Sequence, residues 1–174
     1  MTMLFLATCP RGITSLLRKE LCRLGAESAV ERPSGVNFMG PLSLAYRACL
    51  WSRLANRVII ELADSEIHSA DDLYDLVSAI PWGDHIHPTG SLVVDFSGQS
   101  KFIRNEQFGA QKVKDSIVDQ FRSAGLGRPS VNKVSPDVRV AVKLFRNRLK
   151  LGIDLSGGEP SQTWLSVVRR LGTS

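Results

Sequence analysis

Two neighbouring stretches of alternating hydrophobicity constrain the fold more than any other feature of the sequence. Every second position is valine or leucine in residues 138–144 and leucine or isoleucine in residues 149–155. A period of two is the pattern of a strand that buries one face. Because only residues 145–148 separate the two stretches, the pattern predicts a β-hairpin. Four side chains should point into a core: Val140, Val142, Leu151 and Ile153.

Residues 1–66 are predicted to fold as strand, helix, strand, strand, helix, strand. The strands are expected at 3–7, 28–31, 36–39 and 57–62. Pro10 suits the first turn of the first helix, Gly25 suits its C-cap, and Pro41 should open the second helix. The order βαββαβ is that of a ferredoxin-like unit.

Residues 67–156 are predicted to form a second α/β domain. Ser69 and Asp72 resemble a capping box, so a helix should run from there to Pro81. A strand is expected at 91–96 and a long helix at 105–123, followed by a loop and then the hairpin. The fold class is therefore α+β or α/β, with an N-terminal ferredoxin-like domain at 1–66, a second domain at 67–156 and a divergent, loose tail at 157–174.

Positive charge is concentrated in one segment of the chain. The whole sequence has a formal net charge of +5. Residues 1–100 hold 8 basic and 11 acidic side chains, whereas residues 101–150 hold 12 basic and 4 acidic ones, a net charge of +8 for that segment. Such an asymmetry favours a positive surface that binds nucleic acid. The alternative is an ordinary solvated surface rich in lysine and arginine.

The long helix offers candidate RNA contacts. Its expected core residues recur at helical spacing: Ala110, Val113, Ile117 and Phe121. Polar residues three or four positions apart should form a stripe on the opposite side, where cationic and amide side chains suit phosphate and ribose. The predicted RNA-binding residues are this stripe, its neighbours and two cations on the outer face of the hairpin: Lys101, Arg104, Gln107, Gln111, Lys112, Lys114, Arg139 and Lys143. The alternative is a plain solvated helix face.

No sequence motif indicates catalysis. The only G-x-G begins at Gly125 and follows a helix, unlike the strand-to-helix turn that binds dinucleotides. No Asn-Pro or Asp-Pro dipeptide is present, which excludes the N/D-P-P-Y/F loop of amino-group methyltransferases. We therefore assign no catalytic residue and no cofactor to this chain.

Other partners are also not indicated. His85 and His87 lie in an expected loop without a third strong ligand, so no metal site is assigned. The three cysteines lack C-x-x-C spacing and should be buried free thiols. No apolar run reaches the roughly 18 residues of a membrane span, so we expect no membrane contact and a cytoplasmic location.

Several motifs resemble a known family. Residues 4–8, 50–55, 95–98 and 103–119 are similar to the start of the THUMP-containing rRNA guanine-N2 methyltransferases, in particular the large-subunit member, and the similarity extends to about Gly158. His85 and His87 are not part of that family's pattern. Beyond Gly158 the sequence also departs from it.

The resemblance implies a ferredoxin-like domain followed by a THUMP domain with a mixed sheet and flanking helices. Such a pair delivers RNA, here 23S rRNA, to a downstream methyltransferase domain that uses S-adenosylmethionine. The chain itself should bind structured RNA and carry out no chemistry. Two alternatives remain: a small S-adenosylmethionine-dependent methyltransferase with an unrecognised site, or a protein-interaction domain for an acidic partner.

Overall fold

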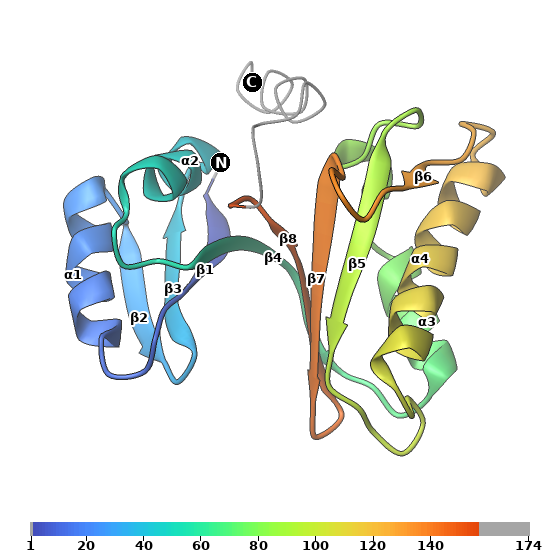
Figure 1. Ribbon diagram of the computed structural model, residues 1–174, viewed down its shortest axis with the longest axis horizontal. Helices are drawn as coiled ribbons and strands as arrows, with labels where there is room; N and C mark the ends of the chain where they lie inside the picture. Colours follow the sequence, from blue (N-terminus) through green and yellow to red (C-terminus); the bar gives the residue numbers. More distant parts are fainter. Residues whose placement is uncertain (1, 157–174) are drawn as a thin grey trace. The chain divides into compact units, whose positions relative to one another are not determined.

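The computed structural model describes residues 2–156, which divide into two units (Figure 1). Unit 1 consists of Met1–Glu61 and Ile153–Gly157, and unit 2 contains Leu62–Gly152. Unit 2 is therefore an insertion in the sequence of unit 1. The boundaries fall inside two strands, β4 (Arg57–Glu66) and β8 (Arg148–Asp154), so each of these strands contributes to both units.

Unit 1 has the predicted ferredoxin-like topology. Its elements are β1 (Met3–Thr8), α1 (Thr14–Leu24), β2 (Ser28–Arg32), β3 (Gly35–Gly40), α2 (Leu42–Trp51) and the first half of β4. The strand order is β2-β3-β1-β4, with antiparallel pairing of β1 to both neighbours and of β2 to β3. Alternate residues of β1 and β3 are buried, and the rings of Phe5 and Phe38 stack with centroids 5.2 Å apart.

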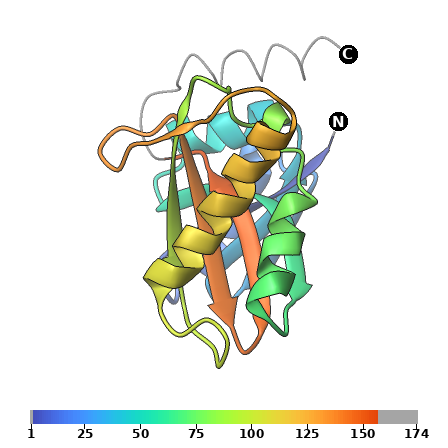
Figure 2. The same ribbon diagram turned by 90° about the vertical axis from the view of Figure 1, so that its right-hand side faces the viewer.

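Unit 2 has a mixed sheet covered by helices on one face. Its elements are the second half of β4, α3 (Ala70–Ser78), the 3-10 turn η1 (Trp82–Asp84), β5 (Ser91–Ser97), α4 (Glu106–Ser123), β6 (Ser130–Val131), β7 (Val138–Phe145) and β8. The strand order is β4-β8-β7-β5-β6, and β5 runs parallel to both β6 and β7. Figure 2 shows α3 and α4 side by side in front of these strands.

The predicted hairpin is formed by β7 and β8. Val140, Val142, Leu151 and Ile153 are all buried, as the alternation predicted. Arg146 and Asn147 connect the strands with φ angles of 47° and 66°. Two consecutive positive φ angles are the geometry of a type I′ turn, whose twist matches that of the flanking strands.

Some predicted boundaries are wrong for local reasons. Helix α1 begins at Thr14 and not near Pro10, because Gly12 has a φ of +90° and places a turn between the two. Strand β4 continues to Glu66, beyond the predicted end at Leu62. The expected loop after α4 contains the short strand β6, which is held by backbone hydrogen bonds to Gly90 and Leu92.

Two other expectations need correction. The cysteines are free, but Cys22 is exposed and the other two are only half-buried. Part of the expected loop at 81–88 forms η1, with Trp82 and Ile86 fully buried. The tail predicted at 157–174 lies outside the described residues.

Candidate nucleic-acid interface

The segment that leads into α4 is fixed at both ends. The Gly98 N–H donates a hydrogen bond to a carboxylate oxygen of Glu106 at 3.0 Å. Two further hydrogen bonds join Ser100 and Ile103. The Ser100 N–H donates to the Ile103 carbonyl, and the Ile103 N–H donates to the Ser100 hydroxyl. Ile103 is fully buried, so it anchors the loop in the core of unit 2. Lys101 and Arg104 on either side are exposed. The result is an ordered loop that holds two cations in solvent.

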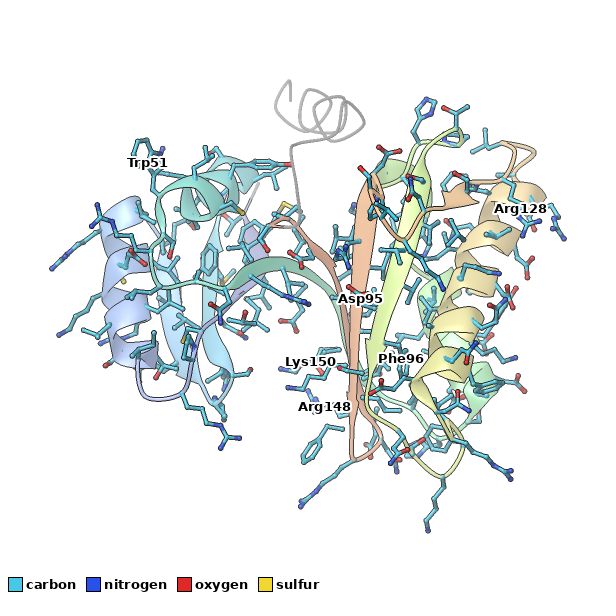
Figure 3. The ribbon with its side chains drawn as sticks, viewed as in Figure 1. Trp51, Asp95, Phe96, Arg128, Arg148 and Lys150 are labelled. Atoms are coloured by element: carbon cyan, nitrogen blue, oxygen red, sulfur yellow. The ribbon has the colours of Figure 1, made fainter. Side chains whose placement is uncertain are left out.

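Two glycines set the position of this loop and helix. At Gly98, where φ is +100°, a Cβ atom would overlap the carbonyl oxygen of Leu144 in β7. At Gly109 a Cβ atom would lie 2.6 Å from the ring of Phe96, so α4 approaches β5 to the depth that a side-chain-free residue allows. Phe96 is labelled in Figure 3, on the strand that α4 covers. Gly109 thus allows α4 to lie close to Phe96 of β5, and Gly98 allows the loop before α4 to lie close to β7.

The N-terminus of α4 is capped by Asn105. Its side-chain oxygen accepts a hydrogen bond from the N–H of Phe108 at 2.7 Å. This satisfies one of the free amide groups of the first turn. The remaining N–H groups and the helix dipole give this end a partial positive charge, to which Lys101 and Arg104 add their own.

The polar stripe on α4 lies at the margin of the exposed face and not opposite the core. Gln107 and Gln111 are exposed, but the Lys114 side chain is only 20% exposed. Val118, which continues the same stripe four residues further on, is buried. On the neighbouring row of the helix, Phe108 and Arg122 are exposed and the side chain of Asp115 between them is 47% exposed. The prediction that the stripe opposes the core is therefore wrong.

The reason is that small residues belong to the buried face. Gly109 and Ser116 are buried, whereas the expected core residue Ala110 is only half-buried. Hydrophobic periodicity gives little weight to glycine and serine, so the predicted core face was rotated relative to the true one.

Several of the predicted contact residues already have partners. The carboxylate of Asp115 accepts from the side-chain amide of Gln111 at 3.0 Å and lies 3.2 Å from the Lys114 ammonium. The Lys112 ammonium lies 5.9 Å from the centroid of the Tyr74 ring. The helix surface is therefore of mixed charge, and the exposed cations Lys101 and Arg104 lie in the loop before its N-terminus.

Hydrogen bonds between α3 and α4 hold the helix in place. The Tyr74 hydroxyl donates to Asp119 at 2.6 Å, a bond that raises the pKa of Tyr74 because the neutral phenol is the donor. The Gln120 amide donates to the carbonyls of Ser78 and Ile80 and accepts from the Trp82 N–H at 2.9 Å. These contacts make α3, η1 and α4 one rigid layer.

Nearby, His85 lies in a largely buried position next to Trp82. Burial lowers the pKa of His85 and outweighs the opposing effect of Asp84. The ring packs edge-on to Trp82, with centroids 6.2 Å apart. His87 is exposed and bonds to Thr89 through Nδ1 at 2.7 Å. Among residues 2–156 no group of three or more His, Cys, Asp or Glu side chains could hold a metal ion.

The other two predicted residues lie on the opposite face of the unit 2 sheet. Val142 pairs with Phe96, which contacts α4, so the even-numbered residues of β7 face the helices. Arg139 and Lys143 therefore face away from them. Arg139 is bound to Asp95 at 2.7 Å and is 28% exposed, whereas Lys143 is exposed. The structure thus divides the predicted residues between two faces and does not gather them in one site.

Sequence reasoning missed Arg146 and Arg148 at the end of the hairpin. Arg148 and Lys150 project from β8 on the face of Lys143, with side chains 63% and 43% exposed. Arg146 occupies the turn, beside the exposed ring of Phe145. The alternation that located the hairpin also predicts this face. However, residues 145–148 were interpreted only as a connection.

The strand orders of the two units and the helix layer on one face of unit 2 define the class of protein: a ferredoxin-like domain followed by a small α/β domain with a mixed sheet. The RlmL ferredoxin-like domain matches residues 4–59, and the THUMP domain matches residues 68–154. The chain belongs to the THUMP-domain family, with the RlmL type of first domain. This confirms the resemblance drawn from the motifs.

Its relatives are longer proteins. The chain is 52% identical over 153 residues to a ribosomal RNA large subunit methyltransferase K/L of Cellvibrio japonicus, with 88% of this chain and 20% of that protein covered. It is 54% identical over 153 residues to the protein of the same name from Marinobacter nauticus, with 88% and 21% covered. The chain thus spans about a fifth of these relatives.

A solved structure supports the fold. SMU.472, crystallised in complex with SAH, superposes with a TM-score of 0.80 at 20% identity, covering 99% of this chain and 49% of that one. No helix among residues 2–156 has the length and hydropathy that a membrane crossing requires.

Proposed function

We propose that this chain binds structured RNA, and that its natural partner is 23S rRNA. In this proposal residues 1–66 and 67–156 act as the ferredoxin-like and THUMP domains that hold RNA for a methyltransferase domain downstream in the parent protein. The names of the relatives support the partner. Work on ribosomal RNA would place the protein in the cytoplasm.

One observation supports RNA binding most directly. Lys101 and Arg104 are exposed on a loop that Ile103 anchors in the core, at the positive end of an 18-residue helix. Cations in an ordered loop lose little side-chain and backbone entropy when they meet a phosphate, so they are suited to position an RNA backbone. Gln107 and Gln111 extend the surface along α4, with Lys112 and Lys114 at its margin. Arg139 and Lys143 offer a second contact on the other face of the sheet.

The residues do not fit S-adenosylmethionine. The connection from β5 to α4 is the segment of unit 2 most like a cofactor-binding turn, but its Gly98 is used to approach the Leu144 carbonyl and its cap is an asparagine side chain. We therefore propose that the cofactor binds only to the downstream domain of the parent protein. Calorimetric titration with S-adenosylmethionine would distinguish this from the alternative of a small methyltransferase.

The test of RNA binding is a titration of the full chain with a transcribed fragment of 23S rRNA at several salt concentrations. We expect binding that weakens steeply with salt, because neutralised phosphates release counterions. An equally tight complex with an acidic polypeptide of the same charge would contradict the proposal and favour the protein-interaction alternative.

A second prediction concerns catalysis. Incubated with labelled S-adenosylmethionine and unmodified 23S rRNA, this chain should transfer no methyl group, because it has no cofactor turn and no N/D-P-P-Y/F loop. The measurement is label retained in the RNA, compared with a sample without protein. Incorporation above that background would show that the chain is an enzyme in its own right.

A further inference from the structure

An aromatic ring is exposed at the tip of the β7–β8 hairpin. Phe145 is the last residue of β7, and it is 64% exposed, whereas Leu144 beside it is buried. A single exposed apolar residue is common on protein surfaces. The exposed ring therefore indicates a binding site only if the residues around it suit a ligand.

Those residues are cations. A two-residue turn places Phe145 opposite Arg148 and Lys143 opposite Lys150, and the alternation of both strands puts all four on the face away from the helices. Figure 3 shows Arg148 and Lys150 projecting to the same side of the hairpin. The Arg146 guanidinium carbon lies 5.3 Å from the centroid of the Phe145 ring. We refer to these five residues as the hairpin-tip patch: Lys143, Phe145, Arg146, Arg148 and Lys150.

One carboxylate orders the patch without cancelling its charge. Asp64 in β4 accepts a hydrogen bond from Arg148 Nε at 2.7 Å, and its other oxygen lies 4.0 Å from the Lys150 ammonium. Asp64 thus holds two cationic side chains in place and offsets part of their positive charge. The backbone of the tip is fixed as well, since the Ile67 N–H donates to the Asn147 carbonyl at 2.8 Å.

The combination of ring and cations identifies the chemistry of the ligand. An exposed ring among lysines and arginines suits a single-stranded nucleic acid, because a base stacks on the ring while the cations contact the phosphates on either side. In a duplex the bases are already stacked on one another, and the ring has nothing to bind. An acidic protein would use the cations and leave the ring without a role.

We propose that the hairpin-tip patch binds an unpaired segment of RNA, with Phe145 stacked on a base and Lys143 and Lys150 on the neighbouring phosphates. The proposal rests on the RNA-binding function above, and it adds the class of RNA and a contact surface on the opposite side of the sheet from α4.

The test uses the full chain with two probes, a short single-stranded RNA that carries one fluorescent adenine analogue and a blunt RNA duplex of the same sequence. In the parent the analogue should be quenched on binding, as expected for a stacked base. Phe145→Leu should weaken single-strand binding by about 5- to 150-fold, which is the range for loss of one stacked base, and should abolish the quenching. Duplex binding should not change.

Two further variants separate stacking from charge. Phe145→Tyr keeps an aromatic ring and should retain both affinity and quenching. Lys143→Ala with Lys150→Ala should keep the quenching but reduce the log–log salt slope by about 0.7 for each lost contact. Trp51→Leu, which removes another exposed aromatic ring, in α2 of unit 1, is the matched control and should bind like the parent.

The outcomes distinguish the two proposals. If the parent binds RNA and Phe145→Leu binds the single strand equally well, the hairpin-tip patch is not the contact and the function stands. An equal loss for Trp51→Leu, or tighter binding of an acidic peptide than of the single strand, also overturns the patch as an RNA site. If the parent binds neither probe, the patch proposal fails, and the titration with the 23S rRNA fragment decides the proposed function separately.

Discussion

A single carboxylate in unit 1 shows how a residue within a helix can determine the structure of a distant loop. Glu20 in α1 accepts hydrogen bonds from the Ser52 hydroxyl at 2.6 Å and from the Arg53 N–H at 3.0 Å. These contacts fix the turn after α2, so part of the family-like motif at 50–55 serves the fold. Burial raises the pKa of Glu20, but the hydrogen bonds to the charged form outweigh it, and the net effect is a lowered pKa.

The lowered pKa predicts how stability depends on pH. The folded chain binds the Glu20 proton less readily than the unfolded chain does. The carboxylate therefore adds stability above its ordinary pKa of 4.5, and this contribution is lost as the pH falls through the folded value. Glu20→Gln should lower the free energy of unfolding at neutral pH by about 1 kcal/mol, because a neutral acceptor is weaker and solvent screens the site.

Thermal unfolding of both proteins at neutral and acidic pH checks this. The difference between parent and Glu20→Gln should shrink in acid, whereas Glu66→Gln, an exposed residue at the end of β4, should make little difference at either pH. A stability difference between the parent and Glu20→Gln that stays constant with pH would mean that the charge of Glu20 contributes nothing to stability.

At the scale of elements, helix α4 depends on a contact that its hydrophobic pattern does not reveal. Gly109→Ala adds a methyl group against the Phe96 ring, where the Cβ would lie 2.6 Å away. Overpacking of this kind costs about 1–3 kcal/mol, more than the gain of roughly 0.5–1 kcal/mol in helix propensity from replacing glycine. Gly109→Ala should therefore destabilise unit 2.

Denaturant unfolding of a double-mutant cycle tests the cause. If the methyl group and the ring collide, Phe96→Leu should cost less stability in the Gly109→Ala background than in the parent. Gly83→Ala, where no atom lies within 4 Å of the added Cβ, should be close to neutral. Strictly additive effects would show that the helix adjusts and that the contact does not set its position.

The elements that the sequence predicted well are those with local causes. The hairpin alternates, α3 begins at Ser69, whose hydroxyl accepts from the Asp72 N–H, and α1 ends at Gly25 with a φ of +113°. The end of β4 and all of β6 form only because distant strands pair with them. A polar segment that pairs with a distant strand has no hydrophobic alternation, so its strand cannot be predicted from the sequence. Of the candidate surface, the exposed cations of the loop and of β7 were identified from the sequence, whereas the rotation of α4 and the placement of Phe145, Arg146 and Arg148 at the hairpin tip were not.

At the scale of the whole molecule, the distribution of charge should matter more than its sum. Lys101 and Arg104 are exposed in unit 2, and Lys19 and Arg23 are exposed on α1 in unit 1. Changing either pair to glutamate alters the net charge by the same amount. If RNA binds unit 2, Lys101→Glu with Arg104→Glu should weaken binding and reduce the salt slope by about 0.7 per lost contact. Stability should change by no more than about 0.5 kcal/mol, as for other surface sites.

The control pair should leave the salt slope unchanged. Equal losses from both pairs would mean that RNA responds to net charge alone, and unfolding of the Lys101→Glu and Arg104→Glu variant would mean that the loop is structural. The measurements are RNA titrations at several salt concentrations and a melting curve for each variant.

The insertion of unit 2 within unit 1 has a consequence for how such a protein can be rearranged by recombination. The chain passes from unit 1 to unit 2 within β4 and returns within β8, and these two strands are neighbours. Neighbouring strands lie about 5 Å apart, so the two ends of residues 62–152 can be joined by a short turn. The described part of unit 2, residues 62–152, is therefore one continuous segment of the gene whose two ends lie side by side, so a single exchange is enough to move it into the hairpin of another protein.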